Sequence, residues 1–321
     1  MLGYTLLNKF QKRINACIGL FLRCNLYQCK IGIARSILAL STFLTLLFND
    51  PILLFGEIKQ LHTNHIFFQQ FNFFDLFSHH YYVSKFSALI IIGVVISGYR
   101  PRWTCILHCW ICISFNYSTM LIEGGDQIAG NLSLMLIPIC LFDDRVWHWQ
   151  RSVIVSDMAK LISNYALLII KIQMCLIYFH AGVGKLSVKE WANGTAVYYW
   201  LNDPTFGITP WMHTFMDPLL SSAFGVAILS WGTIVLEIML FMAIVMNRKC
   251  QIYFCIAGLT LHFGILFFQG LVSFFFAMAS GLLFYLWVDN PLGKIGNSFS
   301  TRKKKLPVSS GHSSTPILNS I

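Results

Sequence analysis

The chain is a succession of long, nearly unbroken apolar runs separated by short polar segments. A membrane-spanning helix needs about 20 mostly apolar residues, and it satisfies its own backbone groups where the bilayer core supplies no water. The runs lack the alternation over roughly ten residues that is typical of an outer-membrane barrel. They predict about eight spanning helices, near residues 31–49, 84–99, 103–119, 127–142, 160–182, 219–246, 250–269 and 271–288.

Composition excludes the soluble alternatives. Hydrophobic residues make up 56% of the 321 residues and charged residues 11%, against about 25% charged residues in soluble domains. Too few polar side chains are present to cover a water-facing surface, and disordered or fibrous chains have the opposite composition. The predicted fold class is therefore an all-α, polytopic integral membrane helix bundle.

The net charge of +10 could indicate a nucleic-acid-binding protein, so the placement of the charges matters. If the N-terminus is cytoplasmic, the inner segments hold 18 of the 23 Lys and Arg residues, and the outer segments hold Lys59, Lys185 and Lys189. This distribution follows the positive-inside rule and predicts that both termini are cytoplasmic. The charge sets orientation, so we exclude nucleic acid as a partner and expect a multi-pass protein of the cytoplasmic membrane.

Three regions are expected along the chain. Residues 1–30 form a basic cytoplasmic segment without the cleavage pattern of a signal peptide. Residues 31–290 form the transmembrane domain, and residues 291–321 form a basic cytoplasmic tail of disordered composition. The basic cluster 302–305 is foremost a topology signal, although it could also contact anionic membrane lipid.

Two long outer loops, residues 50–83 and 183–218, are rich in aromatic side chains. This density is typical of an interfacial belt or of a lid that lies on the membrane. The first loop also holds His62, His65 and the pair His79-His80, which could bind zinc, but no carboxylate pattern of a metalloprotease accompanies them.

Ionisable residues inside membrane helices are costly and therefore candidates for function. Lys171, Glu237 and His262 fall about 16, 14 and 18 Å from the inner ends of their predicted helices. Their common depth predicts a Lys171–Glu237 ion pair with His262 in the same polar cavity. The alternative is that backbone carbonyls or water satisfy each group separately.

The segment 178–186 leads out of the fifth predicted helix. Its small residues Ala181, Gly182 and Gly184 would let another helix or a ligand approach closely. Lys185 follows at the outer interface. An apolar site could turn such a lysine into a proton-transfer base, whereas the simpler interpretation is a lysine that extends to water.

Two further polar groups have structural interpretations. Glu123 and Asp126 flank an outer Gly-Gly turn and could hold a cation, but one turn supplies few ligands, so we favour capping of the next helix by Asp126. One face of the third predicted helix carries a Cys/His group that a regular helix cannot wrap around a metal ion, namely Cys105, His108, Cys109 and Cys112. We therefore predict no metal site.

Several stretches resemble the sporulation-delaying protein B family. They are the run 33–40 followed by 46–50, the turn 124–129, the run 136–141 and Trp147-His148-Trp149. The segments 181–191 and 262–276 resemble the wider membrane domain shared with vitamin K-dependent gamma-carboxylases, called the horizontally transferred transmembrane domain. The motifs occur in the same order and cover about residues 31–290.

The resemblance implies a bacterial membrane protein that works with a toxin-precursor protein and a small companion protein. Together they convert the precursor into a mature, exported peptide toxin. Lys185 occupies the position that matches the catalytic base of the carboxylases, the lysine before leucine in Ala-Gly-x-x-Lys-Leu. No large soluble domain follows the membrane part, which argues against vitamin K-dependent carboxylation. Neither the resemblance nor the residues identify a cofactor.

We therefore predict a membrane protein for maturation of a secreted peptide toxin. If it is catalytic, Lys185 is the base, His180 and His262 line the site, and Lys171–Glu237 is the supporting pair. The residues leave open two alternatives, a non-catalytic export scaffold and a carboxylase-related membrane enzyme that acts on another substrate. Secondary transport is disfavoured because the chain has no internal repeat.

Overall fold

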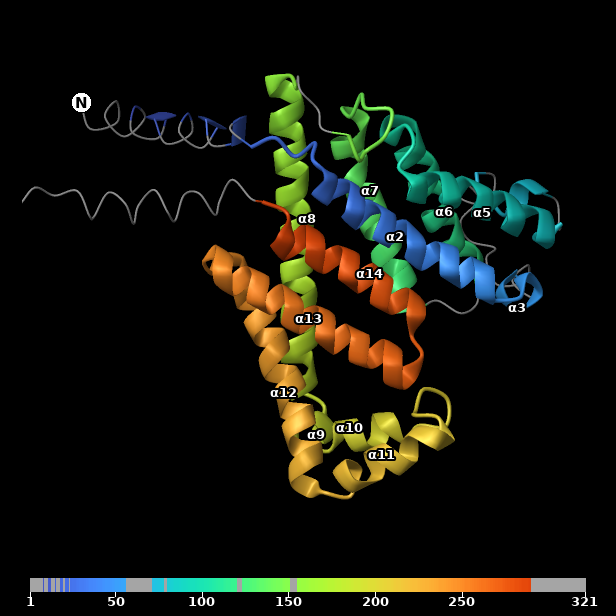
Figure 1. The fold of residues 1–321 in the computed structure, drawn as a ribbon, viewed down its shortest axis with the longest axis vertical. Coiled ribbons are helices and arrows are strands. Elements are labelled where there is room, and N and C mark those ends of the chain that lie inside the picture. Colours follow the sequence, from blue (N-terminus) through green and yellow to red (C-terminus); the bar gives the residue numbers. More distant parts are fainter. Residues whose placement is uncertain are drawn as a thin grey trace, which may run out of the picture.

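A computed structural model describes residues 8, 11, 12, 15, 18, 19, 21, 22, 24–55, 71–77, 80–119, 123–150 and 155–289. The predicted tail, most of the basic N-terminal segment, and His62, His65 and His79 lie outside the described residues. The described chain is a bundle of helices (Figure 1).

Each predicted apolar run coincides with one long helix. These helices are α2 (Cys29–Phe48), α5 (Tyr81–Ser97), α6 (Pro101–Ser118), α7 (Gly124–Leu141), α8 (Asp157–Leu186), α12 (Ala223–Met242), α13 (Arg248–Gln269), and α14 (Val272–Leu282) with its π-helical extension η4 (Leu283–Trp287). Short elements complete the fold, namely α3 (Pro51–Phe55), η2 (Asp75–Phe77), α9 (Lys189–Ala192), α10 (Ala196–Leu201), α11 (Pro210–Leu220) and η3 (Ala243–Val245).

The all-α membrane fold class is confirmed. In the described part of the chain, four helices are long and apolar enough to cross a membrane: α2, α8, α12 continued through η3, and α13. Helix α5 and the segment Val272–Trp287 are shorter apolar helices. The total of eight crossings and the cytoplasmic location of both termini stay predictions.

Residues with strong terminal preferences set several helix ends. Ser156 and Asn247 cap the first turns of α8 and α13, where their side chains accept hydrogen bonds from the amides of Ala159 and Cys250 at 3.2 and 3.1 Å. Helices α5 and α13 end at Gly98 and Gly270, whose positive φ angles of 85° and 71° favour glycine.

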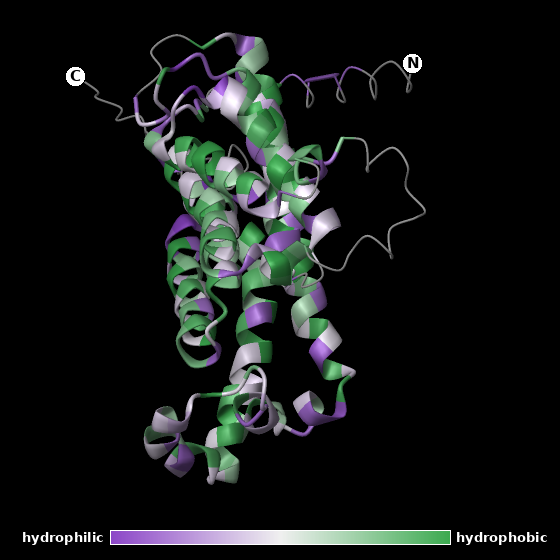
Figure 2. Cartoon of the chain, turned by 90° about the vertical axis from the view of Figure 1, so that its right-hand side faces the viewer, coloured by the Kyte–Doolittle hydropathy of each residue, from purple (hydrophilic) through white to green (hydrophobic). Residues whose placement is uncertain are grey.

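Helix α8 has 30 residues and runs through the long dimension of the bundle (Figure 1). It packs against α7, α12 and η4, while α14 lies along α2 and α6 lies along α7. Ser280 of α14 donates a hydrogen bond of 2.7 Å to the carbonyl of Ala34 in α2. The short helices α9–α11 gather at the far end of the molecule from α5 and α6 (Figures 1 and 2).

The first predicted outer loop is not wholly an interfacial belt. Phe73 and Phe74 are 3% and 2% exposed, and they pack in a core with Phe55 and Phe115. Phe71, at 62% exposed, does face outward. Aromatic density alone could not separate these cases, because a buried aromatic cluster and an interfacial belt have the same composition.

His148 fills the corner between α2, α5 and the loop after α7. Its ring lies against Gly32 and Gly98, and its backbone amide donates a hydrogen bond of 3.0 Å to the Gly98 carbonyl. Burial, together with the positive charges of Arg35 and Arg145, lowers the pKa of His148 to about 3. The ring is therefore a neutral packing element at physiological pH.

Replacing Gly98 with alanine should destabilise the protein more than the same change at Gly270. Both sites have positive φ, so alanine costs about 1–2 kcal/mol at each. A Cβ at Gly98 would also lie 2.4 Å from the His148 ring, whereas a Cβ at Gly270 would meet no atom within 4 Å. Thermal midpoints of the two purified variants in detergent test this. Equal midpoints would show that the His148 ring can move away from the added methyl group without a loss of stability.

Candidate functional site

The C-terminal half of α8 packs closely against α12. A Cβ added at Gly182 would lie 3.0 Å from the Ile238 side chain and 3.3 Å from its backbone nitrogen. Glycine here lets the two helices approach, as the small residues of this segment predicted. Gly184, by contrast, has open space around it. The close contact brings the end of α8 beside Glu237, in the last third of α12.

Lys185 and Glu237 form an ion pair at this crossing. Lys185 Nζ donates to Glu237 Oε1 and Oε2 at 2.8 and 2.7 Å, and to the Ala181 carbonyl at 3.3 Å. An ammonium group has three donors, so all of them are used. The Lys185 and Glu237 side chains are 21% and 9% exposed. The ring of Trp191 lies 5.2 Å from Nζ and adds a cation–π contact.

A second polar pair lies deeper on the same face of α8. The hydroxyl of Tyr178 and Nε2 of His262 are 3.0 Å apart, and both side chains are buried. Nδ1 of His262 is buried and has no hydrogen-bond partner among the described residues. Tyr178 precedes Lys185 by seven residues, which is two helical turns or about 10 Å along the axis. His262 and Tyr178 are within electrostatic reach of Lys185 and Glu237, respectively.

These four side chains could support proton transfer. A lysine ammonium has no lone pair, so Lys185 can act as a base only after losing a proton. Glu237 lies at hydrogen-bond distance and is the nearest acceptor. Transfer along this contact would leave a neutral amine and a neutral carboxylic acid, which need less solvation than two charges in an apolar site.

The predicted Lys171–Glu237 ion pair is wrong. Lys171 Nζ donates instead to the carbonyl oxygens of Tyr285 and Val288, the latter at 3.0 Å. Lys171 and Lys185 are separated along α8 by about 21 Å. The prediction of a common depth assumed that the helices carrying Lys171, Glu237 and His262 all begin at the same level. Helix α8 instead begins at Asp157, 14 residues before Lys171, and it is Lys171 that lies level with the end of η4. For Lys171 the alternative prediction is confirmed, because backbone carbonyls accept its hydrogen bonds.

Lys171 belongs to a cationic cluster at the end of the last helix. Arg248 and Lys30 contact Asp289 at 3.3 and 2.9 Å. Burial raises the pKa of Asp289, but the hydrogen bond from Lys30 and the neighbouring positive charges outweigh it and hold the pKa below its usual range. Lys171 and Arg248 also bond four consecutive carbonyls, those of Tyr285, Leu286, Trp287 and Val288.

The predicted placement of His180 in the site is also wrong. His180 is exposed, and its ring makes an edge contact with Phe179 at 5.5 Å. At about 100° per residue, it lies about 200° around α8 from Tyr178. Tyr178 is the residue that sequence reasoning missed. Its spacing of seven residues from Lys185 was the available signal, because that spacing repeats one helical face.

The turn before α7 forms a separate polar group. Glu123 is the N-cap residue just before α7 and accepts a hydrogen bond from Ser273, while Asp126 lies in the first turn and accepts one of 3.3 Å from Thr45. Gly125 is required here, because a Cβ would lie 2.6 Å from the Phe274 backbone. The predicted capping of α7 by Asp126 is wrong, because Glu123 occupies the N-cap position and the Asp126 carboxylate lies in the first turn, where it bonds Thr45 of α2. The turn joins α7 to α14 and α2.

The Cys/His group on α6 is buried on one face, as its spacing predicted; it comprises Cys105, His108, Cys109 and Cys112. Within the described residues, no three His, Cys, Asp or Glu side chains converge as metal ligands do. These side chains pack as core residues.

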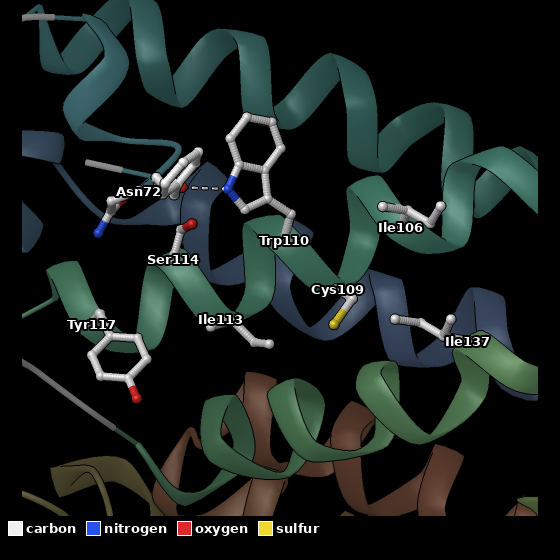
Figure 3. Close-up of a pocket in the computed structure, with 9 residues that line it drawn as sticks. Asn72, Ile106, Cys109, Trp110, Ile113, Ser114, Tyr117 and Ile137 are labelled. Carbon is white, nitrogen blue, oxygen red and sulfur yellow. Dashed lines mark hydrogen bonds between the residues drawn. The ribbon is translucent and has the colours of Figure 1, made fainter. Parts of the chain in front are cut away.

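An open apolar hollow of about 420 Å³ lies along a neighbouring face of α6, and Cys109 belongs to both faces (Figure 3). Trp110 forms one wall and donates a hydrogen bond of 2.6 Å to the Phe71 carbonyl. The rest of the lining is Asn72, Ile106, Cys109, Ile113, Ser114, Tyr117 and Ile137. None of the described lining residues is a carboxylate, lysine or histidine, so the Lys185 region is the better candidate for chemistry.

Comparison with known proteins gives the family. The chain is 34% identical over 279 residues to the sporulation-delaying protein SdpB of Bacillus subtilis strain 168, and the match covers 86% of each chain. It belongs to the SdpB family. The SdpB-family chain is also 34% identical over 260 residues to the uncharacterized protein YitO of the same organism, covering 79% of this chain and 84% of YitO.

Membership of the SdpB family confirms the resemblance seen in the sequence and agrees with the apolar helices of a membrane protein. No protein-family model matches the chain, and no solved structure does. The relation of this SdpB-family protein to the horizontally transferred transmembrane domain therefore stays a prediction.

Proposed function

We propose that the protein matures a secreted peptide toxin of the sporulation-delaying type in the cell membrane and takes part in its export. The observation that carries this proposal is the 34% identity to SdpB across 86% of both chains. Similarity along most of both chains favours a shared task rather than a shared segment. A toxin-precursor protein and a small companion protein are the proposed partners.

Lys185 is the proposed base for any chemical step. The ion pair with Glu237 supports this role, because Glu237 can take the lysine proton when substrate enters. Once Lys185 has taken a proton from the substrate, Glu237 releases its own proton to water or to the product, and the ion pair forms again. His262 and Tyr178 are proposed to line the same site. His180 is excluded from this site by its exposure, and Lys171 by its distance along α8.

One observation favours a non-catalytic scaffold as the second candidate. All three donors of Lys185 are satisfied within the protein, which is also what a purely structural ion pair between α8 and α12 would need. The catalytic and the structural role predict different levels of secreted peptide when both charges are removed together.

Mass spectrometry of secreted peptides tests the proposed function. A strain that lacks this gene but keeps the precursor gene should release no mature peptide, and plasmid-borne wild-type protein should restore it. Release of unchanged mature peptide by the deletion strain would refute toxin maturation. It would instead favour a membrane enzyme that acts on another substrate.

A further inference from the structure

Helix α11 presents three different faces around its axis. Trp211, Phe215 and Leu219 follow one another at four-residue spacing and share one face, and they are 58%, 74% and 37% exposed. Met212 and Leu220 lie on a second face, which is buried in a small core with Leu201, Ile208 and Val226. The buried face thus anchors α11, while Trp211 and Phe215 remain more than half exposed.

The third face of α11 is polar. His213 Nδ1 and Asp217 Oδ1 are 2.9 Å apart at a spacing of four residues, and their side chains are 36% and 63% exposed. A short helix with an exposed apolar face and an exposed polar face is the pattern of helices that lie in the plane of a membrane surface. Tryptophan is enriched at that depth.

The apolar face of α11 continues the lipid-facing surface of α13. Trp211 contacts Phe267 edge-on, with ring centroids 6.5 Å apart, and Phe267 stacks on Phe263 at 6.4 Å. Phe267 and Phe263 are 50% and 54% exposed on a helix that is long and apolar enough to cross the membrane. Their exposed rings therefore face acyl chains, and Trp211 extends the same aromatic surface.

We propose that α11 is a lipid-binding helix at the membrane surface where α12 begins. Its Trp211–Phe215–Leu219 face inserts at the boundary between head groups and acyl chains, and its His213–Asp217 face points to water. Lipid is the partner that this geometry favours, because the face is continuous with the membrane surface of α13. Phe224 at the start of α12 is also 76% exposed.

Photo-crosslinking in a bilayer tests this proposal independently of toxin maturation. The full-length protein carries p-benzoyl-phenylalanine at position 211, 215, 213 or 217 and is reconstituted into vesicles of phosphatidylethanolamine and phosphatidylglycerol. Position 263 on α13 serves as the lipid-exposed control. Each variant is compared only if its chromatographic profile in detergent matches that of the wild type, and positions 211 and 215 substitute for each other if one variant misfolds.

The expected result is a phospholipid adduct at positions 211 and 215, at a yield comparable to that at position 263, and at least several-fold less adduct at positions 213 and 217. Two results would overturn the proposal. One is an adduct at 263 without one at 211 or 215. The other is crosslinking of position 215 to a second protein chain, which would assign the face to a protein interface.

Discussion

Replacing Lys185 with methionine is expected to abolish secretion of the mature peptide and to lower the thermal midpoint of the protein. The substitution keeps the length and apolar stem of the side chain but leaves Glu237 without its partner. Breaking a buried ion pair from one side costs up to about 3–5 kcal/mol, and uptake of a proton by Glu237 would reduce that cost. Secretion is measured by mass spectrometry and stability by tryptophan fluorescence in detergent.

The double variant K185M/E237M separates a chemical role from a structural one. Replacing both charged partners with apolar side chains removes the unpaired carboxylate, so the thermal midpoint should return toward that of the wild type. Secretion should stay absent, because no base remains. If the double variant instead restores secretion together with stability, Lys185 is a structural partner and the scaffold candidate is correct.

A matched control comes from Lys189, the first residue of α9. It is an exposed lysine four residues beyond Lys185, and it has no ion pair within the described residues. The variant K189M should match the wild type in stability and in secreted peptide. An equal loss of secretion in K189M would point to the positive charge of this region rather than to the Lys185 site.

Apolar run length was sufficient to find the helices. The long helices coincide with the predicted runs because a membrane helix must be continuously apolar, so its sequence carries the information locally. The end of α8 could also be expected to pack closely on another helix, since Gly182 has no side chain to keep a neighbour away. Which residue of α12 lies beside the end of α8 depends on how far the two helices are shifted along each other, so the contact with Glu237 could not be predicted.

Helix offset is the quantity that apolar runs do not contain. Counting residues from the predicted helix ends placed Lys171, Glu237 and His262 at one depth. In the structure, Lys171 instead donates to a carbonyl at the end of η4, and Glu237 pairs with Lys185. The assumption of a common starting level fails because the first turns of α8 pack beside the N-terminal segment, where Asn164 bonds the carbonyls of Phe21 and Cys24. Such offsets are tertiary properties, fixed by packing between distant segments.

Replacing Lys171 with methionine should destabilise the protein without removing the chemical site. The last carbonyls of a helix have no partner within the helix, and Lys171 supplies one to Tyr285 and to Val288. Lys171 is 2% exposed, so water cannot take its place. Leaving buried carbonyls unbonded costs about 1–3 kcal/mol each. A lower thermal midpoint in detergent is expected, with secretion falling only as far as the amount of folded protein falls.

Arg248 provides the control for this expectation, because it also donates to carbonyls at the end of η4 but from a more solvent-exposed position. It bonds the carbonyls of Leu286 and Trp287, but its side chain is 35% exposed. Water can reach those carbonyls in R248M, so its midpoint should fall less than that of K171M. A larger fall in R248M, or an unchanged midpoint in K171M, would mean that charge neutralisation near Asp289, rather than carbonyl bonding, holds this end of the helix. The burial of the Lys171 and Arg248 side chains would then not determine which of the two contributes more to stability.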